Sequence, residues 1–217
     1  MRSIEELTAG ESSWPYVSEI LSDSPFSCEV VSASIEQRER ALTGLQVTVR
    51  SVLGSLAWNC GLVSIDHGWV RLLGAGIESL EGLHVETLLD PSTNRPFEGI
   101  VAAHDVLGGI FVIHGSGFDA EPGEILYWAP DTLDWTPCGM GHADLVTFLV
   151  SDGLTEFYAD ARWDGWQEFV EELPHDHGVA AYPPPWTTEG KLSAVSRRPA
   201  PISEVIAFGF EAARQFG

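Results

Sequence analysis

Positively charged residues are scarce in this chain, which has 11 Lys and Arg residues against 32 Asp and Glu residues. Lys191 is the only lysine, and the segment between Arg95 and Arg162 contains eleven acidic residues but no Lys or Arg. The formal net charge of -21 at pH 7 repels the phosphates of nucleic acids, so we expect no binding to DNA or RNA. Such acidity has two interpretations, because it keeps a protein soluble and it also attracts a basic protein partner.

Cysteine pairs and long apolar runs are also missing. The chain has three cysteines, which is an odd number, and no two of them have CxxC spacing: Cys28, Cys60 and Cys138. This argues against a disulfide framework and a zinc site, and it favours reduced thiols in a cytoplasmic protein. No segment approaches the ~18 consecutive apolar residues that a membrane helix needs, and the opening MRSIEEL does not resemble a secretory signal. We therefore expect a cytoplasmic protein with no membrane partner, and the sequence leaves its oligomeric state open.

Helix signals occur near the N-terminus and again in the last third of the chain. The segments 3–6 and 34–37 have the pattern of a capping box, which opens a helix. From Ala143 onward apolar residues recur with a helical period, and a C-terminal helix is expected over 202–216. Before that helix, residues 173–201 hold three consecutive prolines and predict a Pro-rich surface loop.

The middle of the chain has the features of antiparallel strands. Short segments rich in β-branched and aromatic residues alternate there with Gly-containing turns. Because helices flank these strands and no long linker divides the chain, we expect one α+β domain over residues 1–217, with a mainly antiparallel central sheet. The segments predicted as strands are 28–33, 45–50, 55–61, 62–66, 69–74, 100–106, 109–114 and 124–128, and residues 90–98 are predicted as a loop.

The run HGSG at 114–117 raises the question of a nucleophilic serine. Its glycines lie too close to Ser116 for the G-x-S-x-G elbow, and no helix signal follows, which that elbow requires. The glycines here and at Gly123, together with Pro122, are typical of the connection between two strands of a hairpin. We therefore predict a turn at this place and not a catalytic loop.

Histidine and aspartate are adjacent at three places, Asp66–His67, His104–Asp105 and His175–Asp176–His177. A small metal-dependent hydrolase that uses such His/Asp pairs, with His114 as a further candidate, is the alternative function. Adjacent strand residues point to opposite faces of a sheet, which argues against a metal site at Asp66–His67 and at His104–Asp105. His175 and His177 have the two-residue spacing that puts two ligands on one face of a strand, but no third ligand motif lies nearby and the Pro-flanked segment is expected to be a surface loop. We therefore expect no metal, no cofactor and no catalytic residues.

Eight tryptophans are a further signal. Trp128, Trp135, Trp163 and Trp166 form an aromatic recognition surface in one interpretation, because Trp is enriched in interface hot spots. In the other interpretation they fill core and rim positions.

The segments GGIFVI, GEILYWAPDTLDW and DLVTFL, within residues 108–149, resemble the second half of the SUKH superfamily of Smi/Knr-like and immunity-type proteins. The runs IDHGWVRLLGAG and FYADARWDGW are similar to an uncharacterised bacterial family of unknown function related to that superfamily. The resemblance implies an α+β fold without enzymatic activity, and a role in binding and neutralising toxins. The segment from Pro183 has no counterpart in it.

Charge and resemblance together predict a non-enzymatic protein-binding domain, whose specific form is an immunity-type protein that neutralises a basic toxin. A housekeeping interaction protein is the remaining alternative. We expect the partner contacts to come from acidic residues of the strand connections and one aromatic anchor: Asp119, Glu121, Asp131, Asp134 and Trp135.

Overall fold

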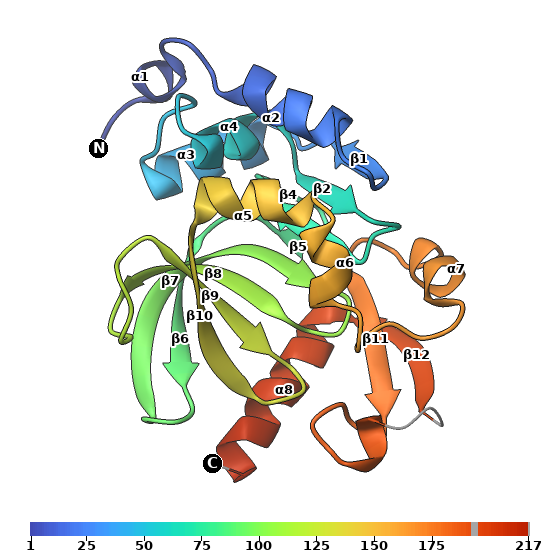
Figure 1. Ribbon diagram of the computed structural model, residues 1–217. Helices are drawn as coiled ribbons and strands as arrows, with labels where there is room; N and C mark the ends of the chain where they lie inside the picture. The colour runs from blue at the N-terminus through green and yellow to red at the C-terminus, as the bar shows by residue number, and fades with distance from the viewer. Residues whose placement is uncertain (192–194, 217) are drawn as a thin grey trace.

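An antiparallel sheet forms the centre of the computed structural model, which describes residues 1–191 and 195–216 (Figure 1). Its strands are β1 (Cys28–Val31), β2 (Leu62–Ile65), β3 (Val70–Leu73), β6 (Val85–Asp90), β7 (Arg95–Asp105), β8 (Ile110–Ser116), β9 (Glu124–Ala129) and β10 (Asp134–Gly141). They follow in the order β1-β2-β3-β7-β8-β9-β10, while β6 pairs with the first part of β7. The α+β class with a mainly antiparallel sheet, predicted from the sequence, is confirmed.

The long strand β7 organises the sheet. Residues 95–100 pair with β6 and residues 103–105 pair with β3, so two strands share one edge of β7. Its other edge pairs with β8. The end of β7, at Asp105, therefore lies in the middle of the sheet, where Asp105 is fully buried.

Helices cover both faces of this sheet (Figure 1). On β9, Tyr127 contacts Phe157 of α6 (Gly153–Phe157), with ring centroids 5.0 Å apart. The next residue, Trp128, stacks on Phe210 of α8 (Ile202–Phe216), with centroids 4.4 Å apart. Because adjacent strand residues point to opposite faces, α6 and α8 lie on opposite faces of the sheet.

Within the described ranges, no helix combines the length and the apolar character needed to cross a membrane.

Further helices lie around the sheet. Four helices gather at one end of the sheet in Figure 1: α1 (Ile4–Thr8), α2 (Trp14–Ser22), α3 (Ile35–Leu45) and α4 (Val52–Asn59). The remaining elements are α5 (His142–Leu149), α7 (Trp166–Glu171), the short 3-10 helix η1 (Glu189–Lys191) and the small hairpin of β4 (Gly76–Ile77) and β5 (Leu80–Glu81).

Two strand predictions in the N-terminal half are wrong. Most of the segment 55–61 lies in α4, and the segment 45–50 starts at the last residue of α3 and continues as the connection to α4. Ser51 begins α4 by accepting a hydrogen bond from the backbone N–H of Gly54 at 3.0 Å. No residue of α4 is exposed, so the helix has no polar face to give the sequence a helical period.

The predicted loop at 90–98 is also shorter than expected. Residues 91–94 form a tight turn, and residues 95–98 already belong to β7. Asp90 holds this turn, because its carboxylate accepts hydrogen bonds from the Ser92 backbone N–H at 2.9 Å and from the Thr93 hydroxyl at 2.6 Å.

The segment 173–201, predicted as a Pro-rich surface loop, contains a hairpin of β11 (His177–Tyr182) and β12 (Ser196–Pro201). Among the described strands, β12 pairs with β11 alone, and an edge strand of this kind tolerates proline because its outer N–H groups need no strand partner. The backbone N–H of Val179 donates to the Val106 carbonyl at 2.7 Å and joins the hairpin to the end of β7. The helix α8 begins directly after β12 and coincides with the helix predicted over 202–216.

Candidate binding pocket

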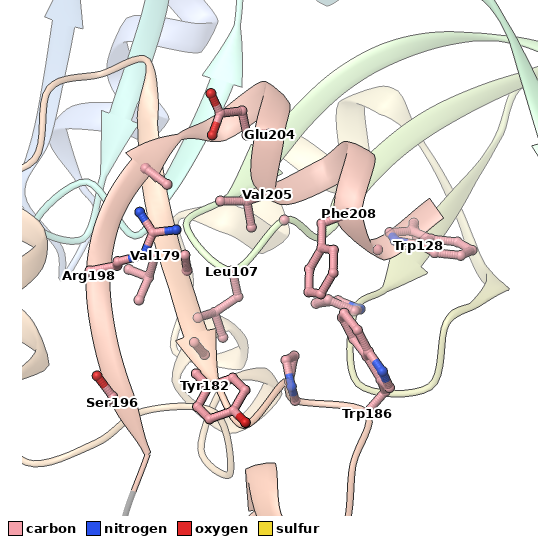
Figure 2. Close-up of a pocket in the computed structure, with 17 residues that line it drawn as sticks. Leu107, Trp128, Val179, Tyr182, Trp186, Ser196, Arg198, Glu204, Val205 and Phe208 are labelled. Atoms are coloured by element: carbon pink, nitrogen blue, oxygen red, sulfur yellow. The ribbon is translucent and has the colours of Figure 1, made fainter. Parts of the chain in front are cut away.

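A cavity of about 540 Å³ lies between α8, the β11–β12 hairpin and the turn that joins β7 to β8 (Figure 2). Its size is within the range of ligand pockets, roughly 300–1,000 Å³. Most of its lining is apolar and comes from segments that are distant in the sequence: Leu107, Gly108, Trp128, Pro130, Val179, Ala180, Ala181, Tyr182, Pro185, Trp186, Ser196, Arg198, Ala200, Glu204, Val205, Phe208 and Gly209.

Asp105 holds the turn that forms one wall of this pocket. One carboxylate oxygen accepts hydrogen bonds from the backbone N–H groups of Leu107 and Gly109, at 2.8 and 2.9 Å. The other oxygen accepts from the hydroxyls of Tyr127 and Tyr158, also at 2.8 and 2.9 Å. The carboxylate therefore connects the turn to β9 and to the end of α6, and it fixes the position of Leu107 in the pocket wall.

The two glycines of this turn are required by its geometry. Gly108 has a φ of 91°, a left-handed conformation that L-residues adopt at a cost. A Cβ atom on Gly109 would lie 2.0 Å from an Asp105 carboxylate oxygen, so any side chain there would displace the carboxylate. The sequence Asp-Val-Leu-Gly-Gly at 105–109 therefore encodes the buried carboxylate and the backbone that surrounds it.

Burial changes the acidity of this network. Desolvation raises the pKa of the Asp105 carboxyl, while its four hydrogen-bond donors act in the opposite direction. Burial and the adjacent Asp105 carboxylate raise the pKa of Tyr127 and Tyr158 well above their ordinary value. Both phenols therefore stay protonated and remain donors to Asp105, which suits a structural role beneath the pocket.

The aromatic residues at the pocket come from α8 and from the hairpin region. Phe208 and Phe210 are two positions apart on α8, so they point about 200° away from each other around the helix. Phe210 stacks on Trp128 in the core, which leaves Phe208 at the pocket with 54% of its surface exposed. Figure 2 shows the Phe208 and Trp186 rings side by side, with centroids 5.1 Å apart, and Tyr182, which is 75% exposed, across from them.

Two charged residues of opposite sign complete the pocket lining. Arg198 is on β12, opposite Ala180 of β11, and Glu204 is in the first turn of α8. Within the described part of the chain, neither side chain has an ion-pair partner within 4.0 Å. Both charges are therefore available to a bound group.

The four acidic residues predicted to bind a partner are all exposed, but they do not form one cluster. Asp119 and Glu121 lie in the connection before β9, and Asp131 and Asp134 lie in and after the turn that follows it. The two pairs are therefore at opposite ends of β9, separated by about 17 Å of extended strand. Asp131 follows Pro130, so the second pair is the one beside the pocket.

The predicted aromatic anchor is a core residue. Trp135 is 5% exposed, its ring lies 5.1 Å from that of Phe97, and its indole N–H donates to the Leu89 carbonyl at 3.0 Å. Trp128 and Trp166 are buried as well, and Trp163 is half-buried. The interpretation of these tryptophans as a recognition surface is therefore wrong, because strand alternation and α7 direct three of the four into the core.

Two members of the histidine and aspartate pairs, His67 and His175, line the same small cavity. His104 and Asp105 point to opposite faces of the sheet, and Asp66 forms an ion pair with Arg162. In residues 1–191 and 195–216, no three His, Cys, Asp or Glu side chains are grouped so that they could hold a metal ion. Cys28, Cys60 and Cys138 are unpaired thiols, of which Cys60 is buried and the other two are half-buried.

The HGSG run lies where a turn was predicted. It includes the last residues of β8, and the chain returns as β9 from Glu124, antiparallel to β8. His114 is 3% exposed, and its Nε2 accepts a hydrogen bond from the backbone N–H of Phe118 at 3.3 Å. The hairpin connection predicted for this run is confirmed.

Sequence reasoning missed the residues that distinguish this pocket, Tyr182, Trp186 and Phe208. Two signals were present. Phe208 and Phe210 cannot both face the core from one helix, and Tyr182 and Trp186 flank three prolines, where a residue that packs in a regular core is uncommon. Neither signal identifies the opposite wall of the pocket, which depends on the pairing of β11 with β12.

Fold and pocket together define an α+β domain with a large antiparallel sheet and an apolar pocket at the junction of its last helix and last hairpin. The family described as "Protein of unknown function DUF2625" matches residues 4–205, so the chain belongs to this family.

Two relatives are similar along most of their length. A protein of Escherichia coli (strain K12), described as "Putative uncharacterized protein YbfG", is 34% identical over 193 residues, 86% of this chain and 86% of its own length. An "Uncharacterized protein" of Haemophilus influenzae (strain ATCC 51907 / DSM 11121 / KW20 / Rd) is 25% identical over 206 residues, 91% of this chain and 88% of its own. No solved structure matches the chain.

Proposed function

We propose that this chain is a non-enzymatic protein-binding domain whose pocket between α8 and the β11–β12 hairpin holds an apolar side chain of a partner protein. One observation carries the proposal: the cavity of about 540 Å³ is bordered by aromatic side chains that are exposed to solvent, Tyr182 at 75% and Phe208 at 54%. Exposed apolar side chains grouped around a concave site are characteristic of surfaces that bind another protein.

A protein partner fits the pocket better than a small molecule that would be enclosed in it. Tyr182 and Phe208 leave much of their apolar surface outside the cavity, where a small ligand would not cover it. An inserted side chain together with its flanking backbone covers both the cavity and its border. Tyr and Trp are favoured at such places because their rings are large and rigid and lose little conformational entropy on binding.

The charge of the chain supports a basic partner. The net charge of -21 creates a field that accelerates the approach of a positively charged protein, and Asp131 and Asp134 lie on the pocket side of β9. The resemblance to the SUKH superfamily supports a narrower form of the proposal, in which the chain is a cytoplasmic immunity-type protein and its partner is a basic toxin.

Selection from a displayed library of random peptides on the immobilised protein tests this proposal. We expect the selected peptides to share an aromatic or large aliphatic residue flanked by Lys or Arg. The double variant with Tyr182→Ala and Phe208→Ala should retain none of them, whereas Tyr16→Ala, which removes an exposed aromatic ring from α2, should retain them all. Selected peptides without a shared apolar residue, or peptides retained by the double variant, would contradict the proposal.

A further inference from the structure

A second cavity, of about 170 Å³, lies between α7 and the edge of the sheet that is formed by β1, β2 and β3. In contrast to the first pocket, its lining is largely polar. It brings together residues from two of the His/Asp motifs, which are more than 100 positions apart in the sequence. The polar side chains that line it are those of Ser27, Glu29, Ser64, His67, Arg71, Glu171 and His175.

Arg71 is the unusual residue of this cavity. Its side chain is 1% exposed, and Nη2 donates a single long hydrogen bond of 3.5 Å to the Pro174 carbonyl. Nε and Nη1 are buried and have no hydrogen-bond partner, and no carboxylate of the described residues lies within 4.0 Å of the guanidinium. The carboxylates of Asp105 and Asp176 act on Arg71 electrostatically and favour its charged form, but neither forms an ion pair with it. Buried N–H groups without an acceptor destabilise a fold, so these free donors indicate a ligand that accepts hydrogen bonds from them.

The sheet register places further unpartnered polar groups beside Arg71. Ser64 is opposite Arg71 on β2, and His104 is opposite Arg71 on β7, so the three side chains share one face of the sheet. His104 is 3% exposed, and neither of its ring nitrogens has a hydrogen-bond partner. Burial and the adjacent Arg71 lower the pKa of His104 to about 3, so the imidazole is neutral and Arg71 is the one cation of this row.

We propose that this cavity binds the carboxylate group of a small ligand, with Arg71 as its cationic partner. The planar guanidinium has a fork of N–H donors that matches the two oxygens of a carboxylate. The hydroxyls of Ser27 and Ser64 at the same cavity are additional donors. The site is separate from the aromatic pocket, so the two proposals stand or fall independently.

The border of the cavity explains why a monoanion is expected. Glu171 lies 3.7 Å from His67 and Glu29 lies 3.9 Å from His175, and both carboxylates are largely exposed. These two negative charges repel a phosphate dianion more strongly than a carboxylate. They also offer acceptors to an ammonium group, so a small amino acid, with one charge of each sign, finds both a cation and carboxylates among the lining residues.

Titration of the ¹⁵N-labelled protein with acetate, glycine and inorganic phosphate, each at constant ionic strength, tests the proposal by NMR. We expect acetate and glycine to shift the Arg71 Nε–H resonance in a saturable manner, and phosphate to bind at least tenfold more weakly than either. Glycine binding more tightly than acetate would support recognition of the ammonium group by Glu29 and Glu171. Tighter binding of phosphate, or no saturable shift with acetate and glycine, would overturn the proposal.

Variants at the cavity make the test specific. For these, the backbone resonances of Ser64 and Gly68 report binding. Arg71→Met should weaken acetate binding at least tenfold, in a protein whose fold is intact by circular dichroism. Arg40→Met, which removes an exposed cation on α3, is the matched control and should bind normally. Ser64→Val places an apolar side chain beside the guanidinium and should also weaken binding. Normal acetate binding by Arg71→Met or by Ser64→Val would overturn the proposal.

Discussion

At the scale of single residues, Asp105 supports the pocket between α8 and the hairpin although it does not line it. Its carboxylate is fully buried, accepts four hydrogen bonds and holds the turn that places Leu107 in the pocket wall. A buried carboxylate is stable only when its oxygens are well paired, so each of these donors contributes to the fold.

One of these donors is the hydroxyl of Tyr158. Tyr158→Phe removes the hydroxyl that donates to Asp105 at 2.9 Å and keeps the rest of the ring. Because a hydrogen bond to a charged group contributes roughly 1.5–3 kcal/mol, we expect the free energy of unfolding in urea to fall by about 2 kcal/mol. Tyr16→Phe, at an exposed ring, should change it by less than about 0.5 kcal/mol. Equal changes in the free energy of unfolding for the two variants would mean that the hydrogen bonds to Asp105 contribute little to stability.

The stability of the fold should also depend on pH through His104. The pKa of His104 is lowered from 6.5 to about 3 by burial and by Arg71. Between these values the unfolded chain binds a proton that the folded chain does not bind, so stability is lost as the pH falls below 6.5. This contribution is about 1.4 kcal/mol per pH unit, or about 2 kcal/mol between pH 6.5 and pH 5. The stability difference between the native chain and His104→Gln, measured by urea unfolding, should therefore shift by about 2 kcal/mol in favour of the variant over that interval. Parallel stability curves would contradict the buried, neutral state of His104.

At the scale of single residues, the sequence shows which backbone conformations a residue type favours, but it does not show in which direction a side chain points. It predicted the connection between β8 and β9 correctly, with Gly117 and Gly123 in the left-handed conformation, although His114, Gly115 and Ser116 still belong to β8. It placed Trp135 at an interface and overlooked Phe208, because the orientation of an aromatic ring depends on the face that its neighbours cover. The same limit applies to His67 and His175, which line one cavity only when α7 folds against the sheet.

At the scale of elements, α8 and the β11–β12 hairpin build the pocket together. The hairpin is attached to the end of β7 by the hydrogen bond from Val179 to Val106, and α8 is attached to the sheet by the stack of Phe210 on Trp128. The position of each element determines the width of the cavity between them.

Two glycines in these elements should respond in opposite ways to replacement by alanine. A Cβ on Gly209, within α8, would lie 3.6 Å from the Trp128 indole nitrogen, an ordinary contact. Gly209→Ala should therefore raise the free energy of unfolding by about 0.5–1 kcal/mol through helix propensity. A Cβ on Gly178 would lie 2.6 Å from the Val106 carbonyl oxygen, so Gly178→Ala should lower it by roughly 1–3 kcal/mol. Urea unfolding measures both variants, and changes of the same sign would contradict the packing described for the hairpin.

The elements differ in how well the sequence predicts them. Helices with capping boxes, such as α1 and α3, were predicted correctly because the cap is a local interaction. The segment 55–61 was predicted as a strand because a short apolar run fits a buried helix equally well. The hairpin within 173–201 was missed because proline argues against strands in general, although an edge strand such as β12 accepts it.

At the scale of the whole molecule, charge is the dominant property. With a net charge of -21, the chain should attract a basic partner over distances comparable to the screening length, about 10 Å at 0.1 M salt. We therefore expect the association rate with such a partner to fall at least tenfold between 0.05 and 0.5 M NaCl, while the dissociation rate changes little. Stopped-flow or surface-based kinetics measures both rates, and an association rate independent of salt would contradict the role of charge.

The most direct test of the central claim is the affinity of a selected peptide for pocket variants, measured by calorimetry. The claim is that the cavity between α8 and the hairpin holds an apolar side chain of the partner. It predicts that Tyr182→Ala combined with Phe208→Ala weakens binding at least tenfold, about 1.4 kcal/mol, while Tyr16→Ala changes it less than twofold. An unchanged affinity in the double variant, with its fold intact by circular dichroism, would show that the partner binds elsewhere and would contradict the claim.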